Sequence, residues 1–458
     1  MRREVPWPAD AAAVARALAS DPASAGWCWL DDWSGRSVLG AAAETRTAEP
    51  GREREFLDGL RESDTATETS QGWAVVLGYE FGQSLLGVDP SPDDAAPGFA
   101  LRLDTALVLD TARRAAELRG PDDAAIDAWM ARFGASLTSN AALGGSAAGG
   151  SAVGDSDASA FGGADGQARW RRTNAAYQAE VEACRSAIRD GDAYVLCLTD
   201  TATAPASGVD PLALYLRLRS GGTPARGGAV VAGERALVSA SPESFLGVGG
   251  GRVSTHPIKG TRPRGETADA DARLAAELAE DPKERAENLM IVDLMRNDLS
   301  RICEPASVAT TGFLRVESHP HVHQLVSTVE GRLRPGRDAI DAIAACFPGG
   351  SMTGAPKRRA VEILRDLEGG PRGLYSGCFG WLGAGDAELA MTIRSVELRG
   401  IGTPGATALV GAGGGVTIDS DPAAEQAEKN LKAAPLLAAL AAERASARAA
   451  GRVAGGYS

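Results

Sequence analysis

The order in which predicted strands and helices follow one another after residue 170 constrains the fold of this chain most. Short apolar runs bounded by Gly, Pro and polar residues predict strands, whereas apolar residues spaced by three or four predict helices. Here the predicted strands come in runs between the helices and do not alternate strictly with them. This order favours an α+β fold over a doubly wound parallel sheet.

The predicted elements cover most of the chain. Helices are predicted at 124–133, 174–190, 211–219, 269–278, 282–299, 339–346, 355–367 and 423–434. Strands are predicted at 27–30, 73–79, 101–109, 194–199, 228–231, 236–239, 245–248, 322–329, 377–382, 389–396, 406–410 and 415–418. Pro435 has no backbone N–H, so we expect it to end or kink the last helix.

A change of composition divides the 458 residues into regions. Residues 140–168 are rich in Gly, Ala and Ser and offer almost nothing to bury, which predicts a disordered linker or a surface insertion. We therefore expect a β-rich N-terminal region at 1–139, a main region at 169–445 and a flexible tail at 446–458.

The charge and composition argue against several kinds of partner. Lys and Arg number 47 against 60 Asp and Glu, a formal net charge of -13, which argues against binding to nucleic acid or to an anionic membrane. No apolar stretch reaches the length of a membrane span, and Asp10 and Arg16 interrupt the N-terminal segment, so we expect no signal peptide. Scattered cysteines without a CxxC pair are typical of a reduced, cytoplasmic protein.

The segment from Pro257 to Arg264 is a short basic block in this acidic chain, and it contains a candidate nucleophile. Pro257 and Pro263 fix φ near its two ends, and Gly260 would let a ligand approach the backbone closely. Lys259 is the residue of this block that can act as a nucleophile, although a lone lysine more often holds a substrate by its charge.

Two predicted helices begin with paired glutamates. Glu284 and Glu287 lie three residues apart near the start of one helix, and Glu425 and Glu428 near the start of the other. The members of each pair face the same way, and two converging pairs would offer the hard oxygen ligands that Mg²⁺ takes. The alternative is ordinary capping, because Asp281 and Glu284 fit an N-cap residue and its N3 acid.

Two glycine-rich segments are candidate anion sites. In residues 347–357 a Gly-rich loop enters a helix, with Thr353 placed to cap it, and exposed N–H groups there suit a carboxylate or phosphate. The alternative is a simple helix cap. The segment from Gly411 to Gly415 follows a predicted strand, and it would either cradle an anion or form a tight turn. Neither segment fits a Walker A or dinucleotide-binding motif.

Arg394, Tyr375 and three histidines each allow two interpretations. An arginine in an apolar strand is costly unless it pairs with a substrate carboxylate or with an internal acid, which applies to Arg394. Tyr375 is more often a packed ring than a ligand contact. His319, His321 and His323 recur at period two, which would place them on one face of a strand. A zinc site is conceivable there, although no Cys or acid is spaced with them.

Taken in chain order, these segments resemble the chorismate-utilising enzymes, and within them the branch that aminates chorismate at C4. The resemblance spans almost all of residues 170–435. It rests on GDAYVLCLTD (191–200), SASPESF (239–245), PIKGTRPR (257–264), DPKERAENLMIVDLMRNDLSR (281–301), HVHQLVSTVEG (321–331), FPGGSMTGAPKRRAVEIL (347–364), RGLYSGCFGWLG (372–383), AMTIRSVEL (390–398) and GAGGGVTIDSDPAAEQAEKNLKA (411–433). The N-terminal region matches more loosely, through WLDDWSGRSVLG (29–40) and LGYEFG (77–82).

The resemblance implies a fold, a metal ion and a set of site residues. It implies two large, mainly antiparallel β-sheets packed face to face with helices outside, and a catalytic region at 169–445 that binds chorismate through Mg²⁺. The implied metal ligands are Glu287 and Glu428, with Glu284 and Glu425 in or next to the coordination sphere. The implied substrate-binding residues are Gly260, Thr261, Thr353, Tyr375, Arg394, Gly413, Gly415 and Lys432.

Lys259 would decide the reaction, because relatives that make anthranilate, isochorismate or salicylate usually carry alanine there. Its implied role is to add at C2 of chorismate with loss of the C4 hydroxyl, after which ammonia adds at C4 and expels the lysine. Glu243 is the implied acid and base. We expect burial beside Mg²⁺ to lower the pKa of Lys259. Gln324, where the anthranilate branch commonly has histidine, fits an enzyme that stops at 4-amino-4-deoxychorismate, a p-aminobenzoate precursor.

The sequence contains no Gly-x-Cys-x-Gly block of a glutaminase. The chain would therefore use free ammonia, or ammonia from a separate glutamine amidotransferase subunit. Asp31 and Asp32 stand where several relatives have a serine of a tryptophan pocket, which argues against such a pocket here. Two alternatives stay open. One is another chorismate chemistry, anthranilate formation, and the other is a non-catalytic subunit that only binds a partner.

Overall fold

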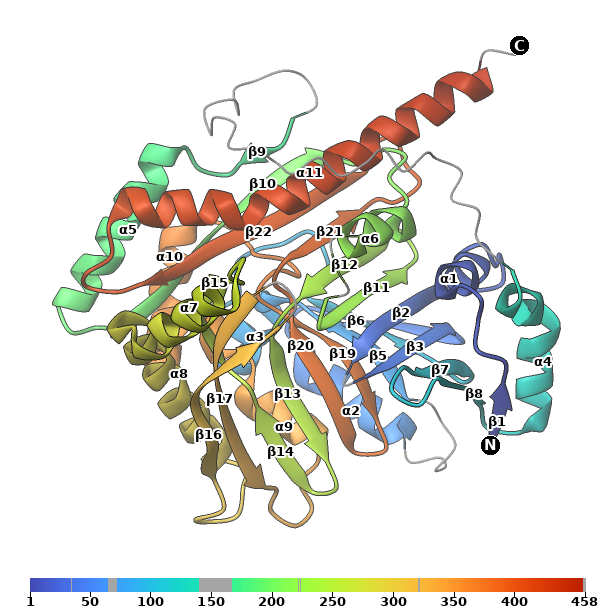
Figure 1. Cartoon of the computed structure of the whole chain (residues 1–458), viewed down its shortest axis with the longest axis horizontal. Coiled ribbons are helices and arrows are strands. Elements are labelled where there is room, and N and C mark those ends of the chain that lie inside the picture. The colour runs from blue at the N-terminus through green and yellow to red at the C-terminus, as the bar shows by residue number, and fades with distance from the viewer. Residues whose placement is uncertain are drawn as a thin grey trace.

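The structure is a computed structural model, and it describes residues 1–33, 35–64, 72–139, 167–220, 222, 224–319 and 322–455. Within these residues two large antiparallel sheets, one of twelve strands and one of ten, pack face to face with helices around them (Figure 1). The predicted α+β class and two-sheet architecture are confirmed. Most of the predicted insertion at 140–168, and His321, lie outside the described residues.

Both sheets draw strands from the whole length of the chain. In sheet order, the twelve-stranded sheet contains β1 (Arg2–Val5), β8 (Ala115–Arg119), β7 (Ala106–Asp110), β3 (Arg36–Ala41), β2 (Gly26–Trp33), β11 (Arg226–Ala232), β12 (Arg235–Ser241), β21 (Ser395–Arg399), β22 (Thr407–Val416), β10 (Val195–Pro205) and β18 (Gly354–Ala355), with β9 (Arg169–Trp170) beside β10. The ten-stranded sheet contains β15 (Ile258–Pro263), β17 (Val322–Arg332), β14 (Arg252–Thr255), β13 (Ser244–Gly249), β20 (Asp386–Met391), β19 (Cys378–Gly383), β5 (Trp73–Leu77), β6 (Gly98–Arg102) and β4 (Glu44–Thr47), with β16 (Ala309–Ser318) beside β17.

Helices cover the outer faces of the sheets. They are α1 (Ala11–Ala19), α2 (Glu53–Asp64), α3 (Tyr79–Leu85), α4 (Asp123–Phe133), α5 (Asn174–Arg189), α6 (Pro211–Arg219), α7 (Ala268–Glu280), α8 (Pro282–Ser300), α9 (Ala339–Cys346), α10 (Lys357–Glu368) and α11 (Pro422–Gly455), with short 3₁₀ turns η1 (Gly134–Leu137) and η2 (Gly350–Met352). Among the described residues, no helix combines the length and the apolar character needed to cross a membrane.

Strand β2 shows how the core is divided, because it is buried on both faces. Cys28 and Leu30 belong to the core between the sheets, together with Val76 and Phe379 of the ten-stranded sheet. Trp29, on the other face, belongs to the core that the twelve-stranded sheet forms with its helices. Successive side chains of a strand point to opposite faces, so a strand covered on both sides reads as one apolar run.

The N-terminal region at 1–139 is not separate from the main region. Strand β2 pairs with β11, with Trp29 opposite Ala229, and β5 pairs with β19, with Val75 opposite Gly380. Strands of both regions therefore share both sheets, and the two regions form one folded body (Figure 1).

Two predicted strands are each divided between the sheets. Residues 101–109 give the end of β6 and then β7, and residues 389–396 give the end of β20 and the start of β21. In the second case the chain passes between the sheets at Arg394, whose φ is 51. A residue with positive φ cannot continue an extended strand, and an apolar run alone does not reveal such a break.

The two predicted strands at 406–410 and 415–418 form one strand, β22. The glycines from Gly411 to Gly415 lie inside it and pair residue by residue with β10. The predicted tight turn was therefore wrong, because pairing with β10 along one edge holds this segment in the sheet, whereas β21 pairs with β22 only up to Val410.

Helix α11 continues through Pro435 to Gly455, so the proline does not end it. Buried side chains at helical spacing hold this helix to the twelve-stranded sheet, and they are Ala433, Leu436 and Leu440. Packing of this apolar face offsets the hydrogen bond that the proline cannot make. Residues 446–455, which were predicted to be a tail, belong to the same helix.

Candidate active site

One cavity of about 710 Å³ collects nearly all of the predicted site residues. It lies where β15, β22 and the first turns of α8 and α11 meet. The predicted residues in its wall are Glu243, Lys259, Gly260, Thr261, Glu284, Glu287, Tyr375, Arg394, Gly413, Gly415, Glu425, Glu428 and Lys432. The fold therefore brings segments that are far apart in the sequence to one place.

Thr353 is the predicted site residue that lies outside this wall. Its side chain is fully buried, and its hydroxyl donates to backbone carbonyls of the Gly-rich loop. It does not cap α10, because that helix begins after Pro356 without a side-chain cap. The capping prediction was wrong, and the neighbours Ser351 and Met352 line the cavity instead.

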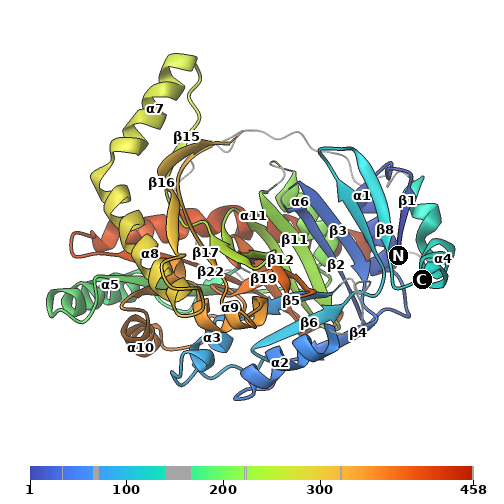
Figure 2. The ribbon, with the colours of Figure 1, turned by 90° about the horizontal axis from the view of Figure 1, so that it is seen from below.

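Lys259 lies on strand β15, at a bulge. The strand pairs with β17, and the register shifts between Lys259 and Thr261. Gly260 occupies the bulge with φ 77, a conformation that favours glycine. A Cβ at Gly260 would lie 2.7 Å from Leu278 Cδ1 of α7, the helix that stands out from the body beside β15 (Figure 2). A side chain here would force the side chains of Leu278 and Glu284 to move.

Carboxylates surround the amine of Lys259. Its Nζ lies 3.8 Å from Glu287 Oε2, and its side chain is largely buried. Burial lowers the pKa of Lys259, but the carboxylates of Glu287, Glu243 and Glu284 outweigh that effect, and the pKa lies above its ordinary value. The predicted lowering concerns Lys259 beside bound Mg²⁺, and it stays a prediction.

Glu243 lies in the turn between β12 and β13 and is buried. Burial raises the pKa of Glu243, while a hydrogen bond with Ser351 and the charge of Lys259 act in the opposite direction. A carboxyl group with a raised pKa keeps its proton closer to neutral pH and can donate it to a leaving group. Glu243 and Lys259 therefore suit acid–base and nucleophilic chemistry in one cavity.

The start of α8 serves both capping and the cavity. Asp281 accepts hydrogen bonds from the backbone N–H groups of Lys283 and Glu284, at 3.0 and 3.1 Å. The side chain of Glu284 nevertheless lines the cavity. The capping interpretation is therefore correct for Asp281, and it leaves the two glutamates of this helix available to a ligand.

The two glutamate pairs have the electrostatics of a cation site. Burial raises the pKa of Glu284, and the neighbouring carboxylate of Glu287 raises it further. Burial also raises the pKa of Glu425, and Glu428 adds to this effect against a hydrogen bond with Ser420. A cation would relieve both the lost hydration and the repulsion within each pair. The residues present therefore fit a hard cation such as Mg²⁺.

Lysines neutralise part of this acidic surface. Lys432 Nζ lies 2.6 Å from Glu428 Oε1, and Lys283 Nζ lies 3.9 Å from Glu287 Oε1. Within the described ranges, no three acidic, His or Cys side chains are close enough together to surround a metal ion. Cation binding would therefore have to draw the glutamates together.

The glycines of β22 form a floor without side chains. A Cβ at Gly415 would lie 3.7 Å from Lys259 Nζ, and a Cβ at Gly414 would lie 2.9 Å from Glu425 Oε2. These glycines thus leave the space into which the lysine and the glutamates project.

Arg394 and Tyr375 also line the cavity. Arg394 Nη1 donates to the carbonyl of Lys432 at 2.7 Å, and no acid lies within ion-pair distance among the described residues. Burial lowers the pKa of Arg394, and Tyr375 and the carboxylate of Glu428 offset this effect only in part. The ring of Tyr375 packs over Gly411, where a Cβ would lie 2.1 Å from Tyr375 Cγ. Tyr375 is therefore a packed ring that also faces the cavity, whereas Arg394 keeps N–H groups for a ligand.

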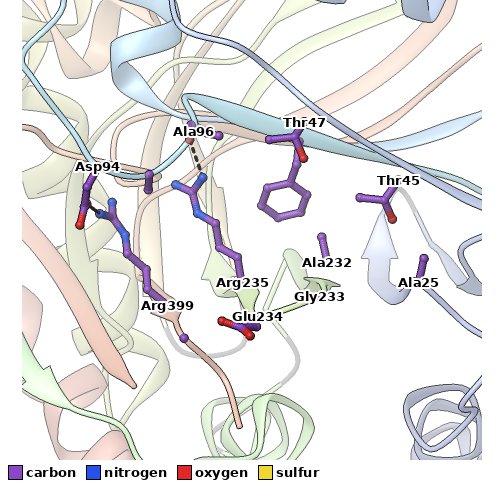
Figure 3. Close-up of a pocket in the computed structure, with 13 residues that line it drawn as sticks. Ala25, Thr45, Thr47, Asp94, Ala96, Ala232, Gly233, Glu234, Arg235 and Arg399 are labelled. Atoms are coloured by element: carbon purple, nitrogen blue, oxygen red, sulfur yellow. Dashed lines mark hydrogen bonds and ion pairs between the residues drawn. The ribbon is translucent and has the colours of Figure 1, made fainter. Parts of the chain in front are cut away.

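A second cavity, of about 560 Å³, lies at the end of the sheets, near β4 and the turn between β11 and β12 (Figure 3). Its two arginines are already paired. Arg235 bonds Glu397 and the carbonyl of Ala96, and Arg399 bonds Glu397 and Asp94. No predicted site residue lines this cavity. We therefore place the candidate active site in the cavity that contains Lys259.

The buried histidine of the segment 319–323 makes hydrogen bonds within the protein. His323 is buried, and its ring nitrogens lie 2.9 Å from Asp271 Oδ1 and 2.9 Å from Ser318 Oγ. The next residue, Gln324, lines the cavity and is buried as well.

Sequence reasoning missed Ser351 and Lys283, which both line the cavity. Ser351 lies in the same Gly-rich loop as Thr353, so the loop was a correct signal and the residue chosen within it was not the one in the wall. Lys283 lies four residues before Glu287, a spacing that places both side chains on one face of a helix.

Residues 22–438 match the family model described as chorismate binding enzyme. The aminodeoxychorismate synthase of Streptomyces griseus is 41% identical over 375 residues, which cover 80% of this chain and 49% of that protein. Anthranilate synthase component 1 of Arthrobacter globiformis is 44% identical over 280 residues, which cover 59% of this chain and 51% of that protein. The chain thus spans about half the length of these curated relatives.

A solved structure has the same fold. The crystal structure of anthranilate synthase component I from Streptococcus pneumoniae TIGR4 matches with a TM-score of 0.74 at 28% identity, covering 88% of this chain and 92% of that one. The two sequence relatives are named for different reactions, and over the matched residues their identities to this chain, 41% and 44%, are nearly equal. Overall sequence identity therefore does not distinguish between those reactions. The residues of the cavity provide the evidence for one reaction over the other.

Proposed function

Because the chain belongs to the chorismate binding enzyme family, we propose that it aminates chorismate at C4 to 4-amino-4-deoxychorismate, using ammonia and Mg²⁺. One observation carries the proposal. The amine of Lys259 lies in the wall of the cavity, with the carboxyl of Glu243 in the same wall. A nucleophile and a proton donor at one substrate support a substitution in which a hydroxyl group leaves.

Lys259 acts as the nucleophile in the proposed first step. Neutral Nζ adds to C2 of chorismate, the ring double bonds shift, and the C4–O bond breaks. Glu243 gives its proton to the departing hydroxyl, which leaves as water, and its raised pKa supports this role. Lys259 must lose a proton before it adds, because the surrounding carboxylates hold its pKa above the ordinary value.

Ammonia completes the proposed reaction in a second step. Its nitrogen adds to C4, the ring double bonds shift back, and the bond between C2 and Lys259 Nζ breaks. Glu243 accepts the proton that the incoming nitrogen loses, so that both residues return to their starting forms. The sum converts chorismate and ammonia into 4-amino-4-deoxychorismate and water.

The charge of the substrate matches the polar groups of the cavity. Chorismate carries two carboxylates, and Arg394 supplies N–H groups for one of them. Mg²⁺ held by Glu287 and Glu428, with Glu284 and Glu425 beside them, would supply positive charge for a carboxylate and would weaken the pull of these glutamates on the lysine proton. The glycine floor of β22 leaves room for a ring at this place.

Anthranilate formation is the second candidate, and the relative of that name from Arthrobacter globiformis supports it. Lys259 and Gln324 favour amination at C4, since the resemblance associates alanine and histidine with the anthranilate branch. We further propose that ammonia is taken up free or from a separate glutamine amidotransferase subunit, because this sequence has no glutaminase nucleophile block.

Identification of the product tests the proposal. The chain is incubated with chorismate, MgCl₂ and an ammonium salt, and the product is identified by mass and absorption spectrum. We expect 4-amino-4-deoxychorismate, and no amino product when ammonium is left out. Anthranilate formed without any added lyase would overturn the proposal. If there is no turnover, calorimetry with Mg²⁺ and chorismate decides, and absence of binding favours a non-catalytic subunit.

A further inference from the structure

The stripe of side chains through which α11 packs on the twelve-stranded sheet begins with a charge. Its buried members are Lys429, Ala433, Leu436 and Leu440. The side chain of Lys429 is 0% exposed, although an apolar residue would fill this place without the cost of removing a charge from water. A buried lysine at this position therefore points to a role other than packing.

Three residues from three elements enclose the ammonium of Lys429, and we call them the Lys429 socket. They are Asp200 of β10, Trp170 of β9 and Tyr177 of α5. Nζ lies 3.1 Å from Asp200 Oδ2, 3.7 Å from the ring centroid of Trp170 and 4.6 Å from that of Tyr177. One charged partner and two ring faces confine the ammonium from several sides.

The carboxylate of the socket is itself fixed in place. Asp200 Oδ1 accepts hydrogen bonds from Arg172 Nη1 at 3.2 Å and from the N–H of Thr201 at 2.9 Å, and the whole side chain is buried. Asp200 lies opposite Ala412 in β22, next to the glycine floor of the cavity. The socket therefore ties α11 to β10, the strand that pairs with the glycine floor of β22. Figure 1 shows α11 lying along β10 and β22.

Small rotations of α11 matter because the glutamates lie on a neighbouring part of the same helix. At about 100° per residue, Lys429 lies about 40° around the helix from Glu425 and about 60° from Lys432. A rotation of about 20° would move carboxylate oxygens about 6 Å from the helix axis by about 2 Å. Distances in metal sites are held within about 0.2 Å, so such a shift would disturb cation binding strongly.

We propose that Lys429 is a positioning residue whose ion pair with Asp200 fixes the rotation of α11, so that Glu425 and Glu428 face the cavity. This inference rests on the proposed function, because it concerns the proposed ligands of Mg²⁺. It assigns a role to a residue that lies outside the wall of the cavity.

Calorimetric titration of the whole chain with MgCl₂ tests this role without measuring turnover. Lys429→Met should weaken Mg²⁺ binding by at least about tenfold, the effect typical of residues that orient metal ligands. The double variant D200N/K429M removes both charges and should recover most of the unfolding midpoint in urea while Mg²⁺ binding stays weak. Lys429→Arg should keep most of the affinity. A double variant that binds Mg²⁺ as tightly as the unchanged chain would overturn the inference.

Leu436→Ala is the matched control on the same stripe. It should lower the unfolding midpoint and leave the Mg²⁺ affinity within about twofold, because it removes packing and not an orienting bond. If the unchanged chain binds no Mg²⁺, the proposed metal site fails, and amide hydrogen exchange then tests the socket alone. Faster exchange of residues 425–432 in the double variant than in the unchanged chain supports the inference, and equal rates overturn it.

Discussion

Two arginines, Arg372 and Arg394, show the difference between a closed polar cluster and an open site. The donors of Arg372 are all occupied, by the carboxylate of Glu368, the carbonyls of Met352 and Cys197 and the hydroxyl of Ser376, at 2.7 to 3.1 Å. Arg394, about twenty residues later, makes one side-chain hydrogen bond within the described residues, to the carbonyl of Lys432.

The same side chain therefore stabilises the fold in one place and remains available to a ligand in the other. Arg372 is 1% exposed, and its partner Glu368 accepts two further bonds from Thr199, so this cluster leaves no donor for a substrate. Cys197 and Met352, whose carbonyls it binds, line the active-site cavity. The closed cluster thus supports the wall of the open site, and removing each arginine should affect a different property.

The largest effect is expected from Arg372→Met. The variant leaves Glu368 buried without its counter-charge, which should lower the free energy of unfolding by about 3 to 5 kcal/mol. Urea denaturation measures this change. Arg394→Met is the matched control and should change the free energy by less than about 1 kcal/mol, because the lost guanidinium faces a cavity. Equal losses in the two variants would remove the distinction between cluster and site.

A pH dependence of stability should come from the closed cluster through Glu80. This carboxyl accepts the N–H groups of Arg372 and Gly373, and burial raises the pKa of Glu80 to about 7 from 4.5. The folded protein holds the proton to a higher pH than the unfolded chain does. The contribution of Glu80 to stability is therefore complete below about pH 4.5 and is lost as the pH rises to about 7, by about 3 kcal/mol.

Glu80→Gln should remove this part of the pH dependence. The measurement is the difference in free energy of unfolding between the unchanged chain and the variant, taken at several pH values from about 4.5 to about 7.5. As the pH rises, the unchanged chain should lose free energy of unfolding relative to the variant. A difference that does not vary with pH would show that Glu80 is ionised in the folded protein over this whole range.

Removing the open arginine should affect the substrate. Arg394→Met should raise the KM for chorismate by about tenfold to a hundredfold, because a charged hydrogen bond to a carboxylate is worth about 1.5 to 3 kcal/mol. Steady-state kinetics at saturating Mg²⁺ and ammonium measure it. An unchanged KM would mean that Arg394 holds the carbonyl of Lys432 and does not meet the substrate.

The smallest effect is expected at the glycine floor. In Gly414→Ala the new Cβ would lie 2.9 Å from Glu425 Oε2, so the carboxylate must move and Mg²⁺ binding should weaken by about twofold to fivefold. Gly405→Ala is the control, since no heavy atom lies within 4 Å of a Cβ there. Tighter Mg²⁺ binding in Gly414→Ala would contradict the view that these glycines make room for the glutamates.

The sequence predicts the residues of the open site better than those of the closed cluster. Lys259 and the four glutamates belong to short motifs, so a resemblance carries them over residue by residue. Arg372 binds the backbone carbonyls of Cys197 and Met352. Because every residue has such a carbonyl, the sequence does not reveal these partners. Sequence patterns also identify most helices and strands, because apolar periodicity survives in each element.

The errors of prediction have a common cause, which is tertiary structure acting on the backbone. The positive φ of Arg394 divides one apolar run between two sheets, and pairing with β10 makes the run from Gly411 to Gly415 part of a strand. Packing of α11 on the sheet carries the helix through Pro435.

The central claim is that Lys259 forms a covalent adduct with the substrate. The chain is incubated with chorismate and MgCl₂ without ammonium, quenched and digested, and the peptide that contains Lys259 is weighed by mass spectrometry. We expect that peptide to gain the mass of chorismate less one water, and the corresponding peptide of Lys259→Ala to gain nothing. Two results together would contradict a covalent role for Lys259. The first is an unmodified Lys259 peptide from a chain that makes 4-amino-4-deoxychorismate once ammonium is added, and the second is full turnover by Lys259→Ala.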